Sequence, residues 1–158
     1  LRELKALGYR RPGLVLHEAH DRRLLYRWEA AFRMHSVQSP GTKSLEPLVA
    51  ANLTKEAFGK WFKAQQPDVV LCHRMEAMQW MAELGARIPE THGFCCLNIM
   101  MSEAPVSGLD LRPRTLGRRA TELLVGQLHR NDYGVPSTAS TTTIPAVWVD
   151  GPTTRQQA

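Results

Sequence analysis

The sequence has no apolar run long enough to cross a membrane. A membrane-spanning helix needs roughly 20 consecutive apolar residues, and no segment of these 158 residues approaches that length. Cysteine is also scarce, because Cys72, Cys95 and Cys96 are too few, and odd in number, for a disulfide framework. Both absences favour a soluble protein in a reducing compartment.

Signatures of catalysis and cofactor binding are missing as well. There is no Gly-rich phosphate loop, no Walker lysine, no HExxH helix and no Gly-x-Ser-x-Gly elbow. His17 and His20 lie three residues apart, but a second pair of metal ligands is absent. Cys72 beside His73 suggests a thiol nucleophile and its base, although adjacent strand residues diverge. We therefore expect no catalytic residue, no metal and no cofactor. A small α/β enzyme that uses Cys72 and His73 is kept as an alternative hypothesis.

The composition is that of a small globular protein. Hydrophobic residues make up 43% of the chain and charged residues 22%, which fits one compact domain or two small lobes. Lys and Arg number 20 against 15 Asp and Glu, for a net charge of +5, with arginines gathered at residues 10–27 and 112–119. This excess permits a polyanionic partner without requiring one, and no interleaved aromatics suggest an RNA-binding sheet.

Short apolar runs alternate with helical patterns through residue 98. Strands are predicted at residues 14–17, 45–50, 69–72 and 94–98, with Cys95 and Cys96 on opposite faces. The intervening segments carry apolar residues at helical spacing: Leu24, Leu25, Trp28, Ala31 and Phe32, then Phe58, Trp61 and Phe62, then Met75, Met78, Met81 and Leu84. These repeats predict an α/β fold with a parallel, doubly wound sheet in three αβα layers.

The pattern changes after Asn98. Residues 99–112 form an extended connection, and Pro113 opens a helix whose apolar face includes Leu116, Leu123 and Leu124. Residues 131–143 are rich in Ser and Thr and predict a loop, residues 146–149 predict a last strand, and residues 153–158 are expected to be disordered.

Ligand sites of α/β sheets lie at the carboxyl ends of the strands. In this chain those ends carry polar groups in residues 17–23, at His73 and Arg74, and at Asn98. The sequence therefore places a candidate small-molecule site at this edge of the sheet.

In order and spacing, the segments resemble the effector-binding domain of LacI/GalR transcription regulators, which has the type I periplasmic-binding-protein fold. The resemblance covers nearly the whole chain: residues 7–15 (LGYRRPGLV), Ala31-Phe32, residues 67–72 (PDVVLC), residues 83–90 (ELGARIPE), Leu116-Gly117 with Leu123-Leu124, and the strand near Trp148. Each segment alone is weak evidence for the resemblance, but the order and spacing of all of them together are specific to this family.

The resemblance implies that the fold is incomplete relative to the family. Residues 1–98 would form the C-terminal effector lobe, 99–112 the interlobe crossover, 113–130 a helix of the N-terminal lobe, and 131–152 a loop and returning strand. A helix without its own sheet would expose its apolar face.

The resemblance also implies ligand-binding residues. These are His20, Arg22, Arg23, Arg27, Trp28, His73, Arg74 and Asn98. Trp28 and Asn98 stand where sugar-binding members have an Arg and an Asp, so an indole and an amide replace groups that grip sugar hydroxyls. Trp28 can stack on a sugar face, and the arginines can pair with an anionic ligand.

The implied function is that of a cytoplasmic regulator without catalysis. It would bind a small effector, a sugar or related metabolite, as a homodimer, and contact DNA through an N-terminal helix-turn-helix absent from this chain, with no membrane partner. Candidate interface residues are Phe58, Trp61, Met75, Met78, Met81, Met100 and Met101. The alternative is a periplasmic solute-binding receptor of the same fold.

Overall fold

The computed structural model describes residues 1–43 and 45–157, which fall into two units. The first comprises Leu1–Leu109 together with the segment from Trp148 onward, and the second is Asp110–Val147. Ala158, part of the predicted disordered tail, lies outside the described residues. Among the described residues, no helix combines the length and apolar character that crossing a membrane requires.

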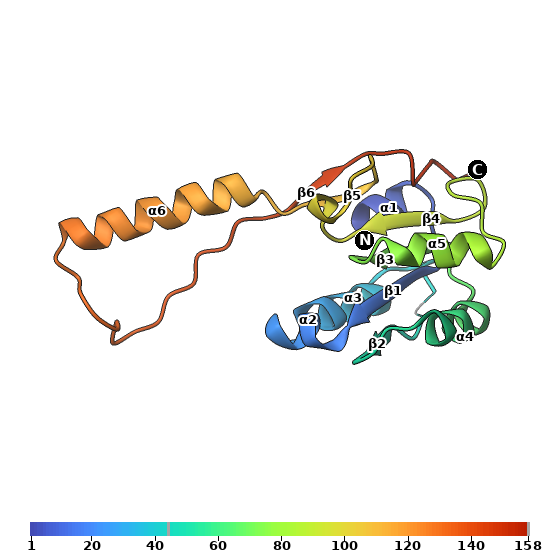
Figure 1. Cartoon of the computed structure of the whole chain (residues 1–158), viewed down its shortest axis with the longest axis horizontal. Helices are drawn as coiled ribbons and strands as arrows, with labels where there is room; N and C mark the ends of the chain where they lie inside the picture. Colours follow the sequence, from blue (N-terminus) through green and yellow to red (C-terminus); the bar gives the residue numbers. More distant parts are fainter. Residues whose placement is uncertain (44, 158) are drawn as a thin grey trace. The chain divides into compact units, whose positions relative to one another are not determined.

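A six-stranded sheet with the order β2-β1-β3-β4-β5-β6 organises the chain (Figure 1). Each pair from β2 to β5 is parallel, and Leu14 of β1 pairs with Leu71 of β3, which pairs with Cys95 of β4. The strands are β1 (Pro12–His17), β2 (Leu48–Ala50), β3 (Val69–Cys72), β4 (Gly93–Cys96), β5 (Gly108–Asp110) and β6 (Val147–Val149). This parallel α/β architecture confirms the predicted fold class.

One helix precedes the first strand, and the others lie between strands in the sequence. They are α1 (Arg2–Ala6), α2 (Glu18–Arg23), α3 (Arg27–Gln38), α4 (Lys55–Gln65), α5 (Glu76–Glu83), the 3₁₀ turn η1 (Ile99–Met101) and α6 (Pro113–His129). Thr54 caps α4 by accepting a 3.2 Å hydrogen bond from the Ala57 N–H. After α5 the chain turns through Gly85, whose φ of +91° favours glycine.

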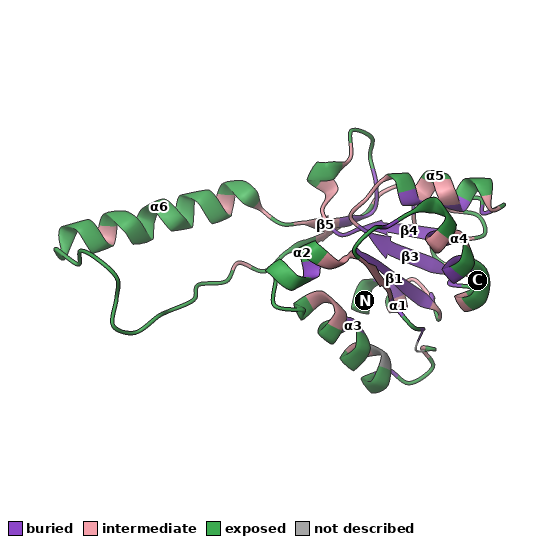
Figure 2. Cartoon of the chain, turned by 60° about the horizontal axis from the view of Figure 1, so that its bottom comes forward, coloured by how far each residue is buried: buried purple, intermediate pink, exposed green. Residues whose placement is uncertain are grey.

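Two apolar layers enclose the sheet, and its central strands are buried (Figure 2). On one face, Phe58 of α4 and Met81 of α5 pack with Val70 and Phe94. On the other face, a second cluster is formed by Leu4, Tyr9, Leu14, Leu16, Phe32, Val69, Leu71, Cys95 and Leu97. Cys96 belongs to the first cluster and Cys95 to the second, which confirms their predicted opposite orientation.

The first predicted helix differs from the observed structure. The sequence predicts one apolar face beginning at Leu24, whereas the chain forms two helices separated at Leu24–Tyr26, where Leu25 and Tyr26 have positive φ values. Leu25 is 72% exposed, while Phe32 is buried. The break is stabilised by Asp21, a buried residue that accepts a 3.1 Å hydrogen bond from the Trp28 N–H. A buried polar side chain that binds backbone groups has no periodic signal in the sequence.

The tail also differs from its prediction. Residues 153–157 are held in place, because the Thr153 hydroxyl accepts a hydrogen bond from the Ser107 N–H (2.9 Å) and donates one to the Phe94 carbonyl (2.7 Å). The Gln157 N–H donates to the Leu7 carbonyl at 2.7 Å. A polar sequence suggested disorder, but these hydrogen bonds use backbone groups that no strand pairs.

The second unit contains α6 and the segment that follows it. Pro113 occupies the first turn of α6, as predicted. No residue of α6 is buried, and Leu124 is 56% exposed, so the expected exposure of its apolar face is confirmed. The chain from 130 to 146 forms neither helix nor strand.

Candidate functional site

The polar residues that follow β1 and β3 meet at one edge of the sheet. His17 is the last residue of β1 and caps α2, since its Nδ1 accepts a 3.2 Å hydrogen bond from the Ala19 N–H. β3 ends at Cys72, whose Sγ accepts a 3.3 Å hydrogen bond from the Arg74 N–H and so shapes the turn that carries His73. Because β1 and β3 are parallel neighbours, their following residues are brought together.

Three histidines form a cluster at this edge. Nδ1 of His20 is in hydrogen-bond contact with Nε2 of His73, and the two ring centroids are 4.3 Å apart. The His17 ring lies 5.7 Å from the His20 ring. Protonation decides which nitrogen of the His20–His73 pair donates. The contact couples a residue of α2 to the loop after β3.

The surroundings of the cluster disfavour protonated histidine. Burial, followed by the positive fields of His20, His17, Arg74 and Arg23, lowers the pKa of His73 to about 4. Burial and the fields of Arg23, His17 and Arg74 also lower the pKa of His20. At neutral pH the pair therefore consists of uncharged imidazoles beside guanidinium groups.

Arg74 adds a fixed positive charge to the site. Its Nη2 donates to Oε1 of Glu76 at 2.9 Å, and its Nε donates to Oε2 at 3.4 Å. This pairing lowers the pKa of Glu76 and keeps it ionised. Glu76 is the only carboxylate among the described residues that line the site, and Arg74 holds it.

These side chains border an open hollow of about 570 Å³. Its lining comprises His17, Ala19, His20, His73, Arg74, Met75, Glu76 and Met101. The imidazoles and Arg74 supply hydrogen-bonding groups, while Met75 and Met101 provide adaptable apolar contacts. The hollow can therefore accommodate a small molecule with both polar and apolar surface.

Three of the predicted ligand-binding residues meet at the hollow, namely His20, His73 and Arg74. Arg22, Arg23 and Arg27 are exposed on α2 and α3, and Trp28 packs against the core. The Asn98 side chain caps η1 by accepting a 3.2 Å hydrogen bond from the Met100 N–H. These five do not line the hollow, and the ligand-binding role of all eight stays a prediction.

The prediction did not include five residues that also line the hollow, among them Ala19 of α2. His17 was placed at the strand end but not among the ligand-binding residues, although its position directly after an apolar run was the available signal. Met75 and Met101 were assigned to an interface, and Glu76 was not considered. Nothing in the pattern around Met101 indicates that η1 lies beside the hollow.

The buried thiols offer no nucleophile. Cys72 is fully buried, and this burial raises the pKa of its thiol to about 11. Burial likewise raises the pKa of Cys95 to about 12. Within residues 1–43 and 45–157, no group of three His, Cys, Asp or Glu side chains is arranged to hold a metal ion. The hypothesis of a Cys72–His73 enzyme therefore has no structural support.

The helices proposed for the dimer interface direct part of their apolar side chains inward. Phe58, Trp61 and Met81 are buried in the core of their own chain, so these side chains present no surface to a partner. Met100 and Met101 are 66% and 60% exposed, and Met75 and Met78 are partly buried, so the interface stays a prediction for these four residues.

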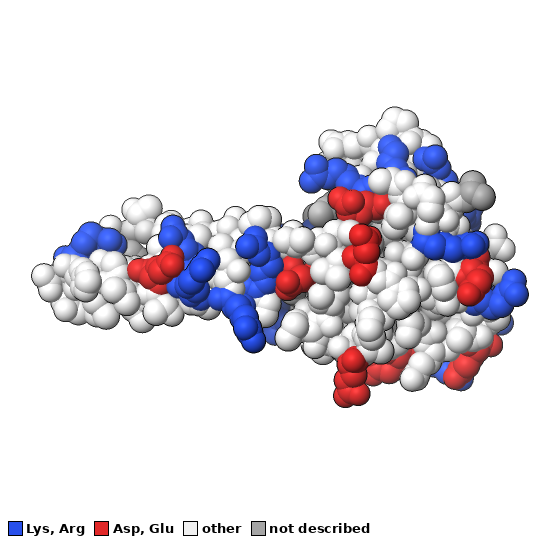
Figure 3. Space-filling view, turned by 90° about the horizontal axis from the view of Figure 1, so that it is seen from above, with Lys and Arg blue, Asp and Glu red and all other residues white. Residues whose placement is uncertain are grey.

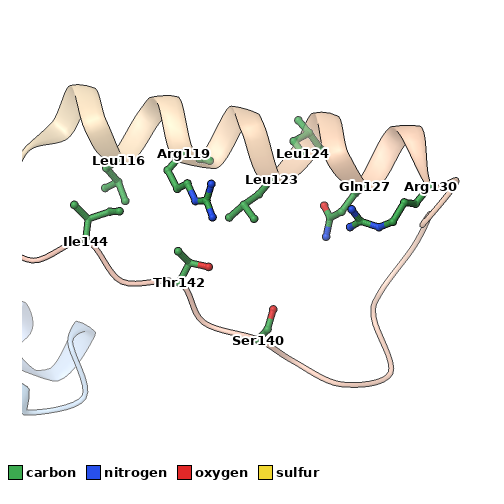
Figure 4. Close-up of a pocket in the computed structure, with 10 residues that line it drawn as sticks. Leu116, Arg119, Leu123, Leu124, Gln127, Arg130, Ser140, Thr142 and Ile144 are labelled. Atoms are coloured by element: carbon green, nitrogen blue, oxygen red, sulfur yellow. The ribbon is translucent and has the colours of Figure 1, made fainter.

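A second hollow, of about 470 Å³, lies within the Asp110–Val147 unit (Figure 4). Leu116 and Leu123 of α6 point toward Ile144 and Thr142 of the returning segment, and Arg119 and Gln127 add polar groups. The arginines of α6 share its surface with one acid, Glu122, which pairs with Arg119 at 3.1 Å. Figure 3 shows acidic side chains in red among the basic ones in blue on this face of the molecule.

The sheet order, the two helical layers and the polar strand ends define a periplasmic-binding-protein-like fold. The profile of the periplasmic binding protein-like domain family matches residues 1–154, so the chain belongs to this family. No curated protein sequence matches the chain.

Solved structures of LacI-family regulators share this fold, which confirms the resemblance seen in the sequence. They include the dimeric Lac repressor with an 11-residue C-terminal deletion, at 15% identity and a TM-score of 0.70, where the match covers 99% of this chain and 60% of the repressor chain. A LacI-family regulatory protein from Corynebacterium glutamicum has 17% identity, a TM-score of 0.67 and coverages of 99% and 63%.

A LacI-family regulator from Enterococcus faecium, solved with bound ribose, is similar at 17% identity with a TM-score of 0.64. The match covers 99% of this chain and 60% of the Enterococcus chain. This chain thus spans about three fifths of the length of the structures it resembles.

Proposed function

We propose that this chain is the effector-sensing and dimerising part of a cytoplasmic LacI-type transcription regulator. The observation that carries this proposal is the hollow at the ends of β1 and β3, where His20, His73 and Arg74 meet. Its position matches the place where α/β sheets bind ligands. The family membership and the regulator fold support the same reading.

The effector in this proposal is a small molecule, a sugar or a related metabolite. The ribose-bound Enterococcus faecium regulator supports this class, because its fold is shared by this chain. Polar hydrogen-bonding groups opposite two methionines suit a ligand with hydroxyl groups and an apolar face. No catalytic step is part of the proposed function.

Signalling would follow from differential binding. A ligand that binds one arrangement of two lobes better than another shifts the equilibrium between them. In a homodimer this shift changes the spacing of paired DNA-reading domains, here helix-turn-helix domains outside this chain. The solved Lac repressor of similar fold is dimeric, which supports a two-fold assembly.

A thermal-shift screen of sugars, sugar acids and nucleobases on the full-length protein tests the proposal. A ligand that binds only the folded state at 100 times its Kd stabilises the protein by about 2.7 kcal/mol and raises its Tm. The variant His73→Asn should lose the response, whereas His129→Asn, on the exposed end of α6, should keep it. A screen without any response, or a response unaffected by His73→Asn, contradicts the proposal.

A further inference from the structure

Groups that carry or can take a positive charge outnumber the carboxylates that line the hollow. Its positive and potentially positive groups are Arg74 and the imidazoles of His17, His20 and His73, and Arg23 of α2 acts electrostatically on two of those imidazoles. The one lining carboxylate, Glu76, already pairs with Arg74. Of the acids of α2, Asp21 is buried and accepts a hydrogen bond from the Trp28 N–H. Neither Asp21 nor Glu18, the other acid of α2, is among the groups that act electrostatically on His20 or His73.

An uncharged ligand does not correct this imbalance. A neutral sugar can hydrogen-bond to an imidazole, but it brings no charge to offset the positive field that Arg23 and Arg74 exert on the histidine pair. An anionic group offsets those charges and also favours the protonated form of a neighbouring histidine. The His20–His73 contact allows one added proton to be shared by both rings, because each imidazole nitrogen can donate or accept.

We infer that the ligand of this hollow carries an anionic group, a phosphate ester or a carboxylate, which is bound by Arg74 and the His20–His73 pair with uptake of a proton. This inference rests on the proposed effector-sensing function and specifies its ligand class. Arg74 supplies a planar guanidinium that can donate to two oxygens of either anion. Glu76 yields part of its pairing, since a guanidinium has five N–H donors.

Proton uptake sets the direction of the pH dependence. Free His73 is neutral at pH 7 because burial and the positive neighbours His20, His17, Arg74 and Arg23 lower its pKa. A bound anion raises that pKa, so the complex binds a proton that the free protein does not. The affinity for an anion of constant charge therefore increases as the pH falls from 8 toward 5.5.

Matched ligand sets test the inference by isothermal titration calorimetry on the full-length protein. One set is D-ribose, D-ribonate and D-ribose 5-phosphate, and the other is D-glucose, D-gluconate and D-glucose 6-phosphate. An anionic member should bind at least about tenfold more tightly than its neutral sugar, as expected for a charge-assisted hydrogen bond. The preferred anion distinguishes a carboxylate from a phosphate source.

The pH arm uses the sugar acids, whose carboxylate stays ionised from pH 5.5 to 8, whereas a phosphate monoester titrates near pH 6. Titration in two buffers of different ionisation enthalpy measures the protons taken up. If a phosphate ester is the binder, proton uptake is measured at pH 7.5. An anion that binds with no proton uptake overturns that part of the inference.

Single substitutions show which side chains bind the anionic group. Arg74→Gln and His73→Asn should each lower the affinity for the anion by about ten- to hundredfold. The control variants Arg114→Gln and His129→Asn, at exposed positions of α6, should leave this affinity unchanged. His20→Asn, at an exposed position, replaces His73→Asn if the latter fails to fold.

The outcomes separate the inference from the proposed function. Equal binding of neutral and anionic members, or a neutral compound as the sole ligand in the wider screen, overturns the anion inference and leaves effector sensing intact. Binding by no compound in the wider screen overturns both.

Discussion

α4 and α6 are both amphipathic helices, but only α4 has its apolar face buried. α4 buries Phe58, Trp61 and Phe62 against the sheet, whereas α6 keeps Leu116, Leu123 and Leu124 at least 42% exposed. Sequence periodicity predicts both helices equally well. It does not tell what covers each apolar face, because that depends on a sheet being present beside the helix. The following experiments test this difference.

Truncating one apolar helix side chain in each unit should give the largest contrast in stability. Phe58→Ala leaves a cavity in the fully packed layer and should lower the free energy of unfolding by about 3–5 kcal/mol. Leu124→Ala removes an exposed side chain and should change it by less than about 0.5 kcal/mol. Urea denaturation followed by circular dichroism measures both. Equal losses would mean that α6 is covered in solution.

Acid should destabilise the first unit through His73. The unfolded pKa is near 6.5 and the folded pKa is about 4, so below pH 6.5 the unfolded chain binds a proton that the folded chain does not. The full shift corresponds to about 2–3 kcal/mol between pH 6.5 and pH 4, and solvent screening of this partly exposed side chain should reduce the measured loss to about 2 kcal/mol or less. His73→Asn should remove this component, while His129→Asn should retain it. The free energy of unfolding, measured by urea denaturation at several pH values, decides the outcome.

Loss of one buried hydroxyl should have a smaller effect. Thr153→Val leaves the Ser107 N–H and the Phe94 carbonyl without their partner and should cost about 1–3 kcal/mol. Thr142→Val, at an exposed position of the second unit, should cost less than about 0.5 kcal/mol. Thermal denaturation of the two variants compares them. A neutral Thr153→Val would contradict the ordered tail.

Replacing one glycine by alanine in each unit should give the smallest difference in stability. Gly85→Ala places a side chain at φ +91° and should destabilise the protein by about 1 kcal/mol. Gly117→Ala lies inside α6 with open space around it and should instead favour the helix by about 1 kcal/mol. Unfolding curves measure the first change and helical content by circular dichroism measures the second. The same sign at both positions would contradict the assigned conformations.

Much of the sheet could be predicted because its strands are short, fully apolar and bounded by turns. Val69–Cys72 and the alternation of Cys95 and Cys96 follow directly from that pattern. The α2–α3 break and the ordered tail could not be predicted, since they depend on Asp21 and Thr153, single polar residues whose partners lie elsewhere. Whether Phe58 and Met81 face the core or a partner chain could not be predicted, because apolar residues at helical spacing indicate a buried face without telling what covers it.

The candidate site was partly predictable for a geometric reason. Parallel strands end at one edge, which brings His20, His73 and Arg74 together. The inclusion of Glu76 and Met101 depends on how the following loops turn, which strand periodicity does not describe. The same limit applies to Asn98, whose side chain caps η1.

The hydrogen bonds of residues 153–157 also bear on the order in which the chain folds. The Arg155 N–H donates to the hydroxyl of Tyr9, a residue 146 positions earlier in the chain. Tyr9 is synthesised well before Thr153 and Arg155, so the hydrogen bonds that these two residues donate to Phe94 and Tyr9 can form only late in translation. Contacts between residues so distant in sequence slow folding.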